Sequence, residues 1–241
     1  MARLRILSDI TKIEFGGFGC GAMAGFSSTG KAESAKRHLH GGFFYKLSHG
    51  APRMERLSTN YFENDPVECA RGLIGAVFQW NGCSGRIVET EGYRAAGDEA
   101  CHTWHRNTAR KFIAERRAGD AYVYLNYGVH WLFNVLVKSE GESGFVLIRA
   151  LEPLTGIEQM QSRRGNLKLH QLTSGPGKLT RALGIDGTAH GESFLQSGSC
   201  GIFTGTSGTV VSGPRIGISK AIDLPWRFGE KGSPFLSCRF Q

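Results

Sequence analysis

The stretch IGAVFQWNGCSGRIVETEGY, residues 74–93, predicts a β-hairpin. Residues 74–80 and 85–91 are rich in the apolar and β-branched side chains that strands favour. Between them stands Asn81-Gly82, a dipeptide typical of two-residue hairpin turns because both turn positions require positive φ angles. The hairpin therefore predicts an antiparallel sheet near the start of the folded chain.

The second strand of this hairpin carries an unusual row of polar side chains. Side chains alternate between the two faces of a strand, so Glu89, Glu91 and Tyr93 share one face, and Val88 and Thr90 share the other. Because a strand normally buries one face, two acids and a phenol in a row indicate a functional site. A solvated edge strand is the alternative, and this segment alone favours neither.

The remaining pattern predicts a single α+β domain with a largely antiparallel sheet and a few short helices. Asp65 as N-cap, Pro66 at the first helical position and Glu68 at the third predict a helix that ends near residue 73. Strands then alternate with only a few helices, which is typical of α+β domains. We expect strands at 121–138 (a pair), 144–153, 200–204, 209–211, 214–219 and 226–228, helices at 155–164 and 174–183 (the latter capped by Ser174), and a polar segment without strand pattern at 94–119.

Composition limits the class of protein. The chain of 241 residues has a formal net charge of +8 and a pI of about 9.3, which permits a polyanionic partner. Its six cysteines show neither a CxxC pair nor zinc-site spacing, and no apolar run approaches the length of a membrane span. We therefore expect an intracellular protein without membrane attachment, cytoplasmic in a bacterium and nuclear in a eukaryote.

Residues 1–53 differ from the rest of the chain. Eight Lys and Arg residues against three acids give this segment +5 of the total +8, and residues 15–30 are glycine-rich without periodicity. This composition predicts a mobile extension ahead of the folded domain. It is either a basic arm that adds phosphate affinity or a dispensable extension, and we favour the second interpretation.

Tyrosines gather in the second pair of strands. Tyr122 and Tyr124 share a face, and Tyr127 stands beside the turn at Gly128. Aromatic side chains in strands most often belong to the core, yet a tyrosine-rich pair next to two carboxylates also suits a slot that stacks a flat ring. Nearby His102 lacks the spacing of a metal ligand, and we predict no metal site.

The sequence SGPGKL, residues 174–179, resembles a phosphate-binding loop without matching the P-loop pattern. Two interpretations stay open. The start of the helix and Lys178, together with Ser174, would bind one backbone phosphate, or the segment is an ordinary helix start.

Six motifs follow one another along the chain: RIVETEGY, DEACH, AYVYLNYGVHWLFN, VLIRALEPL, TSGPGKLTRAL and PRIGIS. Together they resemble the alkyladenine (3-methyladenine) DNA glycosylases of the mammalian type, in the order and spacing of that family. The resemblance covers residues 57–240 and implies a glycosylase domain over 54–241. Its curved sheet would resemble the C-terminal domain of methionyl-tRNA formyltransferases.

The resemblance implies roles for individual residues. Glu91 would be the general base that activates water, and Arg149 and the main-chain carbonyl of Ile216 would help to hold that water. Tyr93, His102 and Tyr124 would stack around a base flipped out of the duplex, and Asn134 would crowd the exocyclic amine of guanine. Tyr127 would wedge into the gap left in the duplex. The catalytic set is therefore Glu91, Arg149 and Ile216, the base pocket Tyr93, His102, Tyr124 and Asn134, and the wedge Tyr127.

The resemblance also implies a partner and a reaction. We expect a monomer that binds double-stranded DNA containing damaged purines and leaves an abasic site, with no lyase activity, metal or cofactor. The alternative is a catalytically inactive module that binds DNA or RNA. One departure stands out: the family has TPRN where this chain has TARK, residues 108–111, which would loosen the loop carrying His102 and alter the substrate range.

Overall fold

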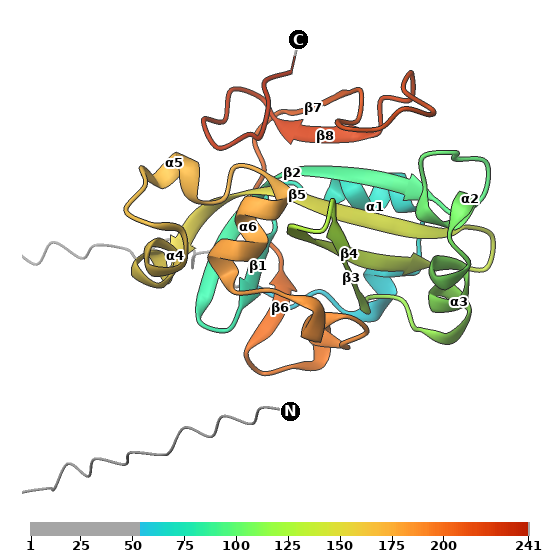
Figure 1. Cartoon of the computed structure of the whole chain (residues 1–241), viewed down its shortest axis with the longest axis horizontal. Coiled ribbons are helices and arrows are strands. Elements are labelled where there is room, and N and C mark those ends of the chain that lie inside the picture. Colours follow the sequence, from blue (N-terminus) through green and yellow to red (C-terminus); the bar gives the residue numbers. More distant parts are fainter. Residues whose placement is uncertain (1–53, 241) are drawn as a thin grey trace, which may run out of the picture. The chain divides into compact units, whose positions relative to one another are not determined.

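The computed structural model describes residues 54–240, and the extension predicted over residues 1–53 lies outside them (Figure 1). The described chain forms one open antiparallel sheet of eight strands with a few helices, which confirms the α+β class. The likeness to formyltransferase C-terminal domains stays a prediction. The strands are β1 Val77–Trp80, β2 Cys83–Arg94, β3 Ala121–Asn126, β4 His130–Lys138, β5 Ser143–Thr155, β6 Cys200–Phe203, β7 Val210–Gly213 and β8 Arg227–Glu230.

The hairpin of residues 74–93 lies in the middle of this sheet, whose order is β3-β4-β5-β2-β1-β6. Asn81 and Gly82 have φ angles of 44° and 83°, as the predicted two-residue turn requires. Strand β2 pairs with two strands along one of its edges. Its first residues pair with β1, and Glu89–Glu91 pair with β8. Its other edge pairs with β5 from Ser84 to Arg94, with register shifts between Ser84 and Gly85 and between Ile87 and Thr90. Strand β2 thus joins both parts of the sheet.

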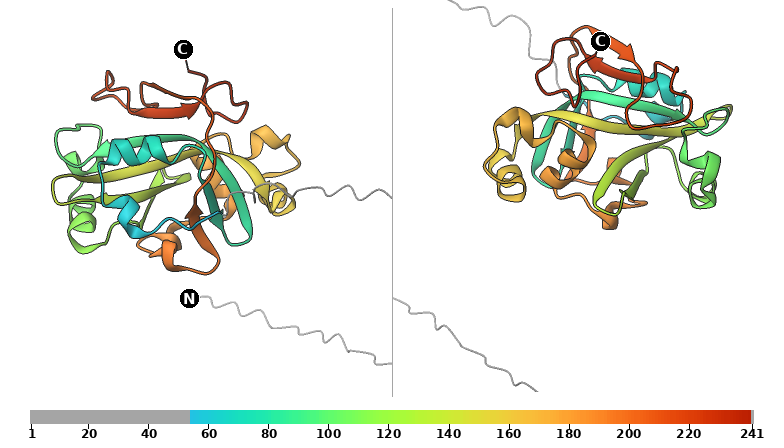
Figure 2. Two further views of the ribbon diagram at one scale, coloured as in Figure 1. Left: turned by 180° about the vertical axis from the view of Figure 1, so that it is seen from behind. Right: turned by 45° about the horizontal axis from the view of Figure 1, so that its top comes forward.

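Helices cover the sheet on both sides. Figure 1 shows α6 in front of the sheet and α1 behind it, and the view from behind in Figure 2 brings α1 forward. The helices are α1 Pro66–Gly72, α2 His102–His105, α3 Asn107–Glu115, α4 Ile157–Arg164, α5 Leu169–Leu172 and α6 Pro176–Leu183, with 3-10 turns at Thr59–Phe62, Gly187–Ala189 and Phe194–Gln196. Across residues 54–240, none of these helices has the length and apolar character needed to cross a membrane.

Helix α1 begins as predicted and packs closely on β2. The Asp65 side chain accepts hydrogen bonds from the amides of Val67 and Glu68 at 2.8 and 3.1 Å. A Cβ atom at Gly92 would lie 2.9 Å from the Cα of Val67, so only glycine permits this approach of helix to strand. The contact fixes the part of β2 that carries Glu91.

Segment 94–119 forms no strand after Arg94, as expected, and its polar sequence contains α2 and α3, with Ala109 and Phe112 buried on one side of α3. Two expectations about local structure were wrong. Residues 214–219 form bends rather than a strand. Ser174 does not cap α6: the N-cap is Gly175, whose positive φ angle of 145° favours glycine, and no side chain caps this end.

Candidate active site

Glu91 of β2 is fully buried and is held by three donors from different parts of the chain. Its Oε1 accepts a hydrogen bond from the backbone amide of Ile216 at 2.7 Å, and its Oε2 accepts one from the Tyr93 hydroxyl at 2.8 Å. The Nη1 of Arg149 lies 3.2 Å from the same Oε2. Burial raises the pKa of Glu91 above its ordinary value, although Arg149 and the two hydrogen bonds oppose this effect.

Arg149 reaches Glu91 from the neighbouring strand. It lies on β5 and is only 5% exposed. Its Nε donates to Glu89 at 2.8 Å and its Nη2 donates to the Ser237 hydroxyl at 3.2 Å. The predicted sharing of one face by Glu89, Glu91 and Tyr93 is therefore confirmed, because both carboxylates contact one guanidinium and Tyr93 contacts Glu91.

Aromatic rings lie beside this carboxylate. The rings of His102 and Tyr124 are 4.3 Å apart at 60°, and Nδ1 of His102 is 3.0 Å from the hydroxyl oxygen of Tyr122. Tyr93 and Tyr124 both pack against a small core that includes Tyr122 and Phe145. Burial, followed by the charge of Arg106, lowers the pKa of His102 to about 4, so this histidine is neutral at pH 7.

Asn134 and Ile216 lie next to these groups in different ways. Asn134 of β4 is buried opposite Tyr122 of β3, and its Nδ2 donates to the Tyr122 carbonyl at 3.1 Å. The Ile216 side chain is partly exposed, and its backbone amide, rather than its carbonyl, contacts Glu91. The role predicted for the Ile216 carbonyl stays a prediction.

Tyr127 occupies the tip of the β3–β4 hairpin. Its side chain is 84% exposed, and the side chains of Leu125 and Val129 beside it are also exposed. Tyr127 and Gly128 have φ angles of 49° and 69°, in the left-handed region that a tyrosine rarely adopts. A large aromatic ring is thus held out from the surface on a strained backbone, which is typical of functional positions.

The possible phosphate-binding segment lies next to this hairpin. A Cβ atom at Gly177 in the first turn of α6 would come within 2.9 Å of the His130 side chain at the start of β4. Lys178 is exposed and Ser174 is half-buried. Their contact with a phosphate stays a prediction, since Ser174 pairs with Ala150 through a backbone bridge and does not cap the helix.

Sequence comparison identifies the family. Residues 60–234 match the family model described as methylpurine-DNA glycosylase. The chain belongs to this family. A protein of Chlorobaculum tepidum named "Putative 3-methyladenine DNA glycosylase" is 41% identical over 76% of this chain and 91% of its own length. A protein of the same name from Rhodopseudomonas palustris is 45% identical over 77% of this chain and 92% of its own length.

Two buried residues of this family member escaped the sequence analysis. Arg215 donates to both carboxylate oxygens of Asp98 at 2.6 and 2.8 Å, and both side chains are fully buried. The Arg215 guanidinium also lies 4.6 Å from the centre of the Tyr93 ring. The Arg215–Asp98 pair connects the segment that carries Ile216 to the loop before α2. Asp98 lies in the motif DEACH and Arg215 in the motif PRIGIS, and these motifs could have drawn attention to both residues.

The segment that departs from the family pattern is helical. Ala109, in place of the family's proline, is buried in α3. Arg110 donates to the carbonyls of Thr103 and Trp104 in α2, which ties the two helices together. The effect of the substitutions on the loop and on the substrate range stays a prediction.

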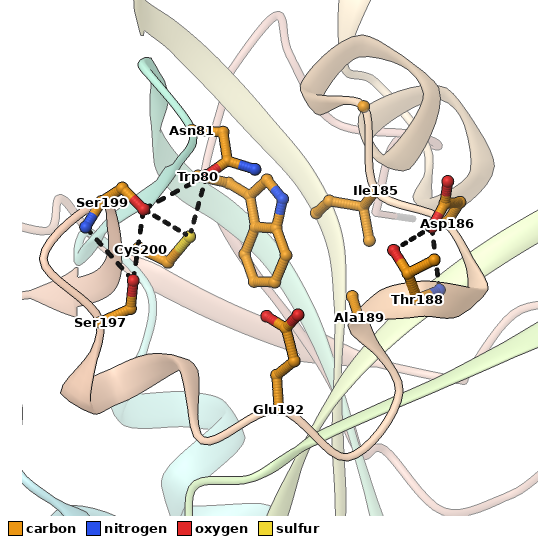
Figure 3. Close-up of a pocket in the computed structure, with 11 residues that line it drawn as sticks. Trp80, Asn81, Ile185, Asp186, Thr188, Ala189, Glu192, Ser197, Ser199 and Cys200 are labelled. Atoms are coloured by element: carbon orange, nitrogen blue, oxygen red, sulfur yellow. Dashed lines mark hydrogen bonds between the residues drawn. The ribbon is translucent and has the colours of Figure 1, made fainter.

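A separate pocket of about 270 Å³ lies near the β1–β2 turn and contains no residue predicted for the site (Figure 3). The Glu192 carboxylate points into it below the Trp80 ring. Within the part of the chain that the structure describes, no three His, Cys, Asp or Glu side chains gather as metal ligands would.

Proposed function

We propose that this protein is a DNA glycosylase that removes alkylated or deaminated purines, of the 3-methyladenine type, from duplex DNA. The observation that carries the proposal is the buried Glu91 carboxylate, held against Arg149 beside the rings of Tyr93 and Tyr124. Family membership and the names of the bacterial relatives support it. A protein that acts on DNA works where the DNA is, which in bacteria such as those of the relatives is the cytoplasm.

Base flipping explains the aromatic groups. A base inside a duplex is out of reach, so the enzyme extrudes it at a cost of a few kcal/mol. The flipped base would stack against Tyr93, Tyr124 and His102, with Asn134 crowding the exocyclic amine of guanine. Tyr127, exposed at a hairpin tip, would fill the gap in the duplex. A cationic N-alkylpurine gains further from the tyrosine faces through cation–π attraction.

Hydrolysis would use Glu91 as the base. The bond between C1′ and the purine nitrogen breaks with its electron pair leaving on the base, and the oxygen of water bonds to C1′. Glu91 takes the proton of that water, while Arg149 and the Ile216 carbonyl hold it in place. The raised pKa of Glu91 makes its carboxylate a better base than an ordinary glutamate. The reaction leaves an abasic site without lyase cleavage and needs no cofactor.

The state of His102 bears on the choice of lesion. With a pKa of about 4, it is neutral at pH 7 and does not act as an imidazolium acid toward the leaving base. A cationic lesion leaves without such help, whereas a neutral lesion such as hypoxanthine leaves less readily. We therefore propose that cationic 3-methyladenine is removed faster than neutral hypoxanthine.

Binding to the duplex would rest on electrostatic attraction. The chain carries a formal charge of +8, and Lys178 and Ser174 at α6 would contact one backbone phosphate next to the wedge hairpin. We propose that the protein acts as a monomer.

The test compares wild type with Glu91→Gln on two substrates. An end-labelled duplex with one hypoxanthine is scored for strand cleavage after hot alkali, and methylated DNA is scored for free base. Activity that needs alkali for strand cleavage and disappears in Glu91→Gln supports a monofunctional glycosylase. Cleavage without alkali would contradict the absence of lyase activity. Duplex binding without activity on either substrate would instead support an inactive binding module.

A further inference from the structure

Glu89 is a second buried carboxylate, two residues before Glu91, and it is fully occupied by donors. Its side chain is 0% exposed. Oε1 accepts hydrogen bonds from Nε of Arg149 at 2.8 Å, from Nε of Arg227 at 2.8 Å and from the Ser237 hydroxyl at 2.7 Å. Oε2 accepts one from the Ser237 amide at 2.6 Å. A buried charge with this many donors is fixed in position.

Glu89 and Glu91 share Arg149. The guanidinium directs Nε to Glu89 at 2.8 Å and Nη1 to Glu91 at 3.2 Å, so Glu89 has the shorter contact. Arg227 of β8 balances the second negative charge, because it also contacts Glu89 at 2.8 Å. The four buried side chains together carry two positive and two negative charges.

We propose that Glu89 is a positioning residue for hydrolysis: it fixes the Arg149 guanidinium and takes up part of the positive charge that would otherwise act on Glu91. This proposal rests on the proposed function, in which Glu91 is the general base. Glu89 acts through Arg149 and touches neither water nor substrate.

The C-terminal residues complete the cluster. Ser237 bonds to Glu89 and also accepts a hydrogen bond from Nη2 of Arg149 at 3.2 Å. Arg227 donates to the Cys238 carbonyl, and its guanidinium lies 3.9 Å from the centre of the Phe240 ring. Figure 1 shows this terminal segment close to β8, above β2. The end of the chain therefore helps to orient Arg149.

The charges around Glu91 predict the effect of removing Glu89. Arg149 faces Glu91 from β5, and the hydroxyls of Tyr93 and Tyr124 and the guanidinium of Arg215 lie around it. Arg227 lies opposite Glu91 in the backbone register of β8, and its side chain contacts Glu89. Arg215 is itself neutralised by Asp98. Without the charge of Glu89, which raises the pKa of Glu91, the positive charge of Arg149 acts on Glu91 alone and the pKa of Glu91 falls. Without Arg227, the cluster loses a positive charge and the negative charge of Glu89 is less well balanced, so the pKa of Glu91 rises.

The experiment measures single-turnover release of free base from methylated DNA between pH 4 and 9 for wild type and three variants. For Glu89→Gln we expect the acid limb of the rate profile to move down by about one pH unit. We also expect the plateau rate to fall about tenfold or more, because Arg149 loses its fixed position. For Arg227→Gln we expect the acid limb to move up. Ser237→Ala keeps every charge and should lower the rate without moving the limb.

Acid limbs that move in opposite directions in Glu89→Gln and Arg227→Gln distinguish a positioning role from general damage to the fold. General damage would lower the rates without moving the acid limb. Acid limbs of Glu89→Gln and Arg227→Gln that coincide with that of wild type would overturn the proposal. If Glu89→Gln does not fold, the other two variants test the proposal. An acid limb that moves up in Arg227→Gln and stays in place in Ser237→Ala supports it, and an unmoved limb in Arg227→Gln overturns it. An inactive wild-type protein would instead refute the proposed function.

Discussion

Replacing Tyr127 by asparagine should stabilise the fold while impairing activity on duplex DNA. Tyr127 has a φ angle of 49° and is followed by Gly128 at 69°, the geometry that Asn-Gly turns adopt. The β1–β2 hairpin of the same sheet has Asn81-Gly82 at two consecutive positive φ angles, in a turn of two residues where the β3–β4 turn has three. Tyr127→Asn therefore installs the turn sequence that this chain uses elsewhere.

The magnitude follows from backbone strain. A left-handed conformation costs an ordinary residue about 1–2 kcal/mol, and asparagine tolerates it better. The Tyr127 ring is 84% exposed, so its loss removes little buried apolar area. We expect the free energy of unfolding to rise by about 0.5–1 kcal/mol, and Tm to rise by about 2–4 °C per kcal/mol. The reverse change, Asn81→Tyr, should be destabilising, because it also removes contacts with Ser199 and Cys200.

Urea and thermal unfolding measure the first effect, and single-turnover excision measures the second. We expect Tyr127→Asn to lose activity on a lesion in duplex DNA, and to lose much less on the same lesion in a single strand, which leaves no gap to fill. A less stable Tyr127→Asn protein would refute the argument from strain. Unchanged excision from the duplex would refute the wedge.

Three further predictions follow from the groups around Glu91. Arg215→Met leaves Asp98 buried without its partner, so urea unfolding should show a loss of about 3–5 kcal/mol, partly recovered by adding Asp98→Asn; no recovery would contradict the pairing. Tyr93→Phe removes a hydrogen bond to charged Glu91 and raises its pKa, so the acid limb of the rate profile should move to higher pH, and a downward shift would count against it. Because the pKa of His102 falls from 6.5 to about 4 on folding, the contribution of neutral His102 to the free energy of unfolding is present above pH 6.5 and is lost as the pH falls toward 4. His102→Asn should flatten the plot of unfolding free energy against pH between pH 6.5 and 4, and an unchanged slope would show that His102 is not its cause.

Local sequence signals predicted the parts of the fold that local physics determines. The Asn81-Gly82 turn and the Asp65 cap each depend on a few neighbouring residues, and both formed as expected. Alternation along a strand likewise placed Glu89 and Glu91 on one face.

Contacts between distant segments could not be predicted in this way. Arg215 and Asp98 are 117 residues apart, and neither has a local pattern that announces the partner. Of residues 214–219, where a strand was expected, only Arg215 is buried, and the others lie at the surface in bends or irregular structure. The charges of α3 masked its helical character, because only Ala109 and Phe112 reach the core. Ser174 failed as a cap because Pro176 moved the start of the helix.

The central claim is that Glu91 activates water without being needed to bind DNA. The most direct test is the single-turnover rate of base release from methylated duplex by Glu91→Gln, measured beside the affinity of the same variant for that duplex. The proposed role predicts a loss of about 10²–10⁴-fold in rate with unchanged affinity. A Glu91→Gln protein that releases the base at the wild-type rate would contradict it.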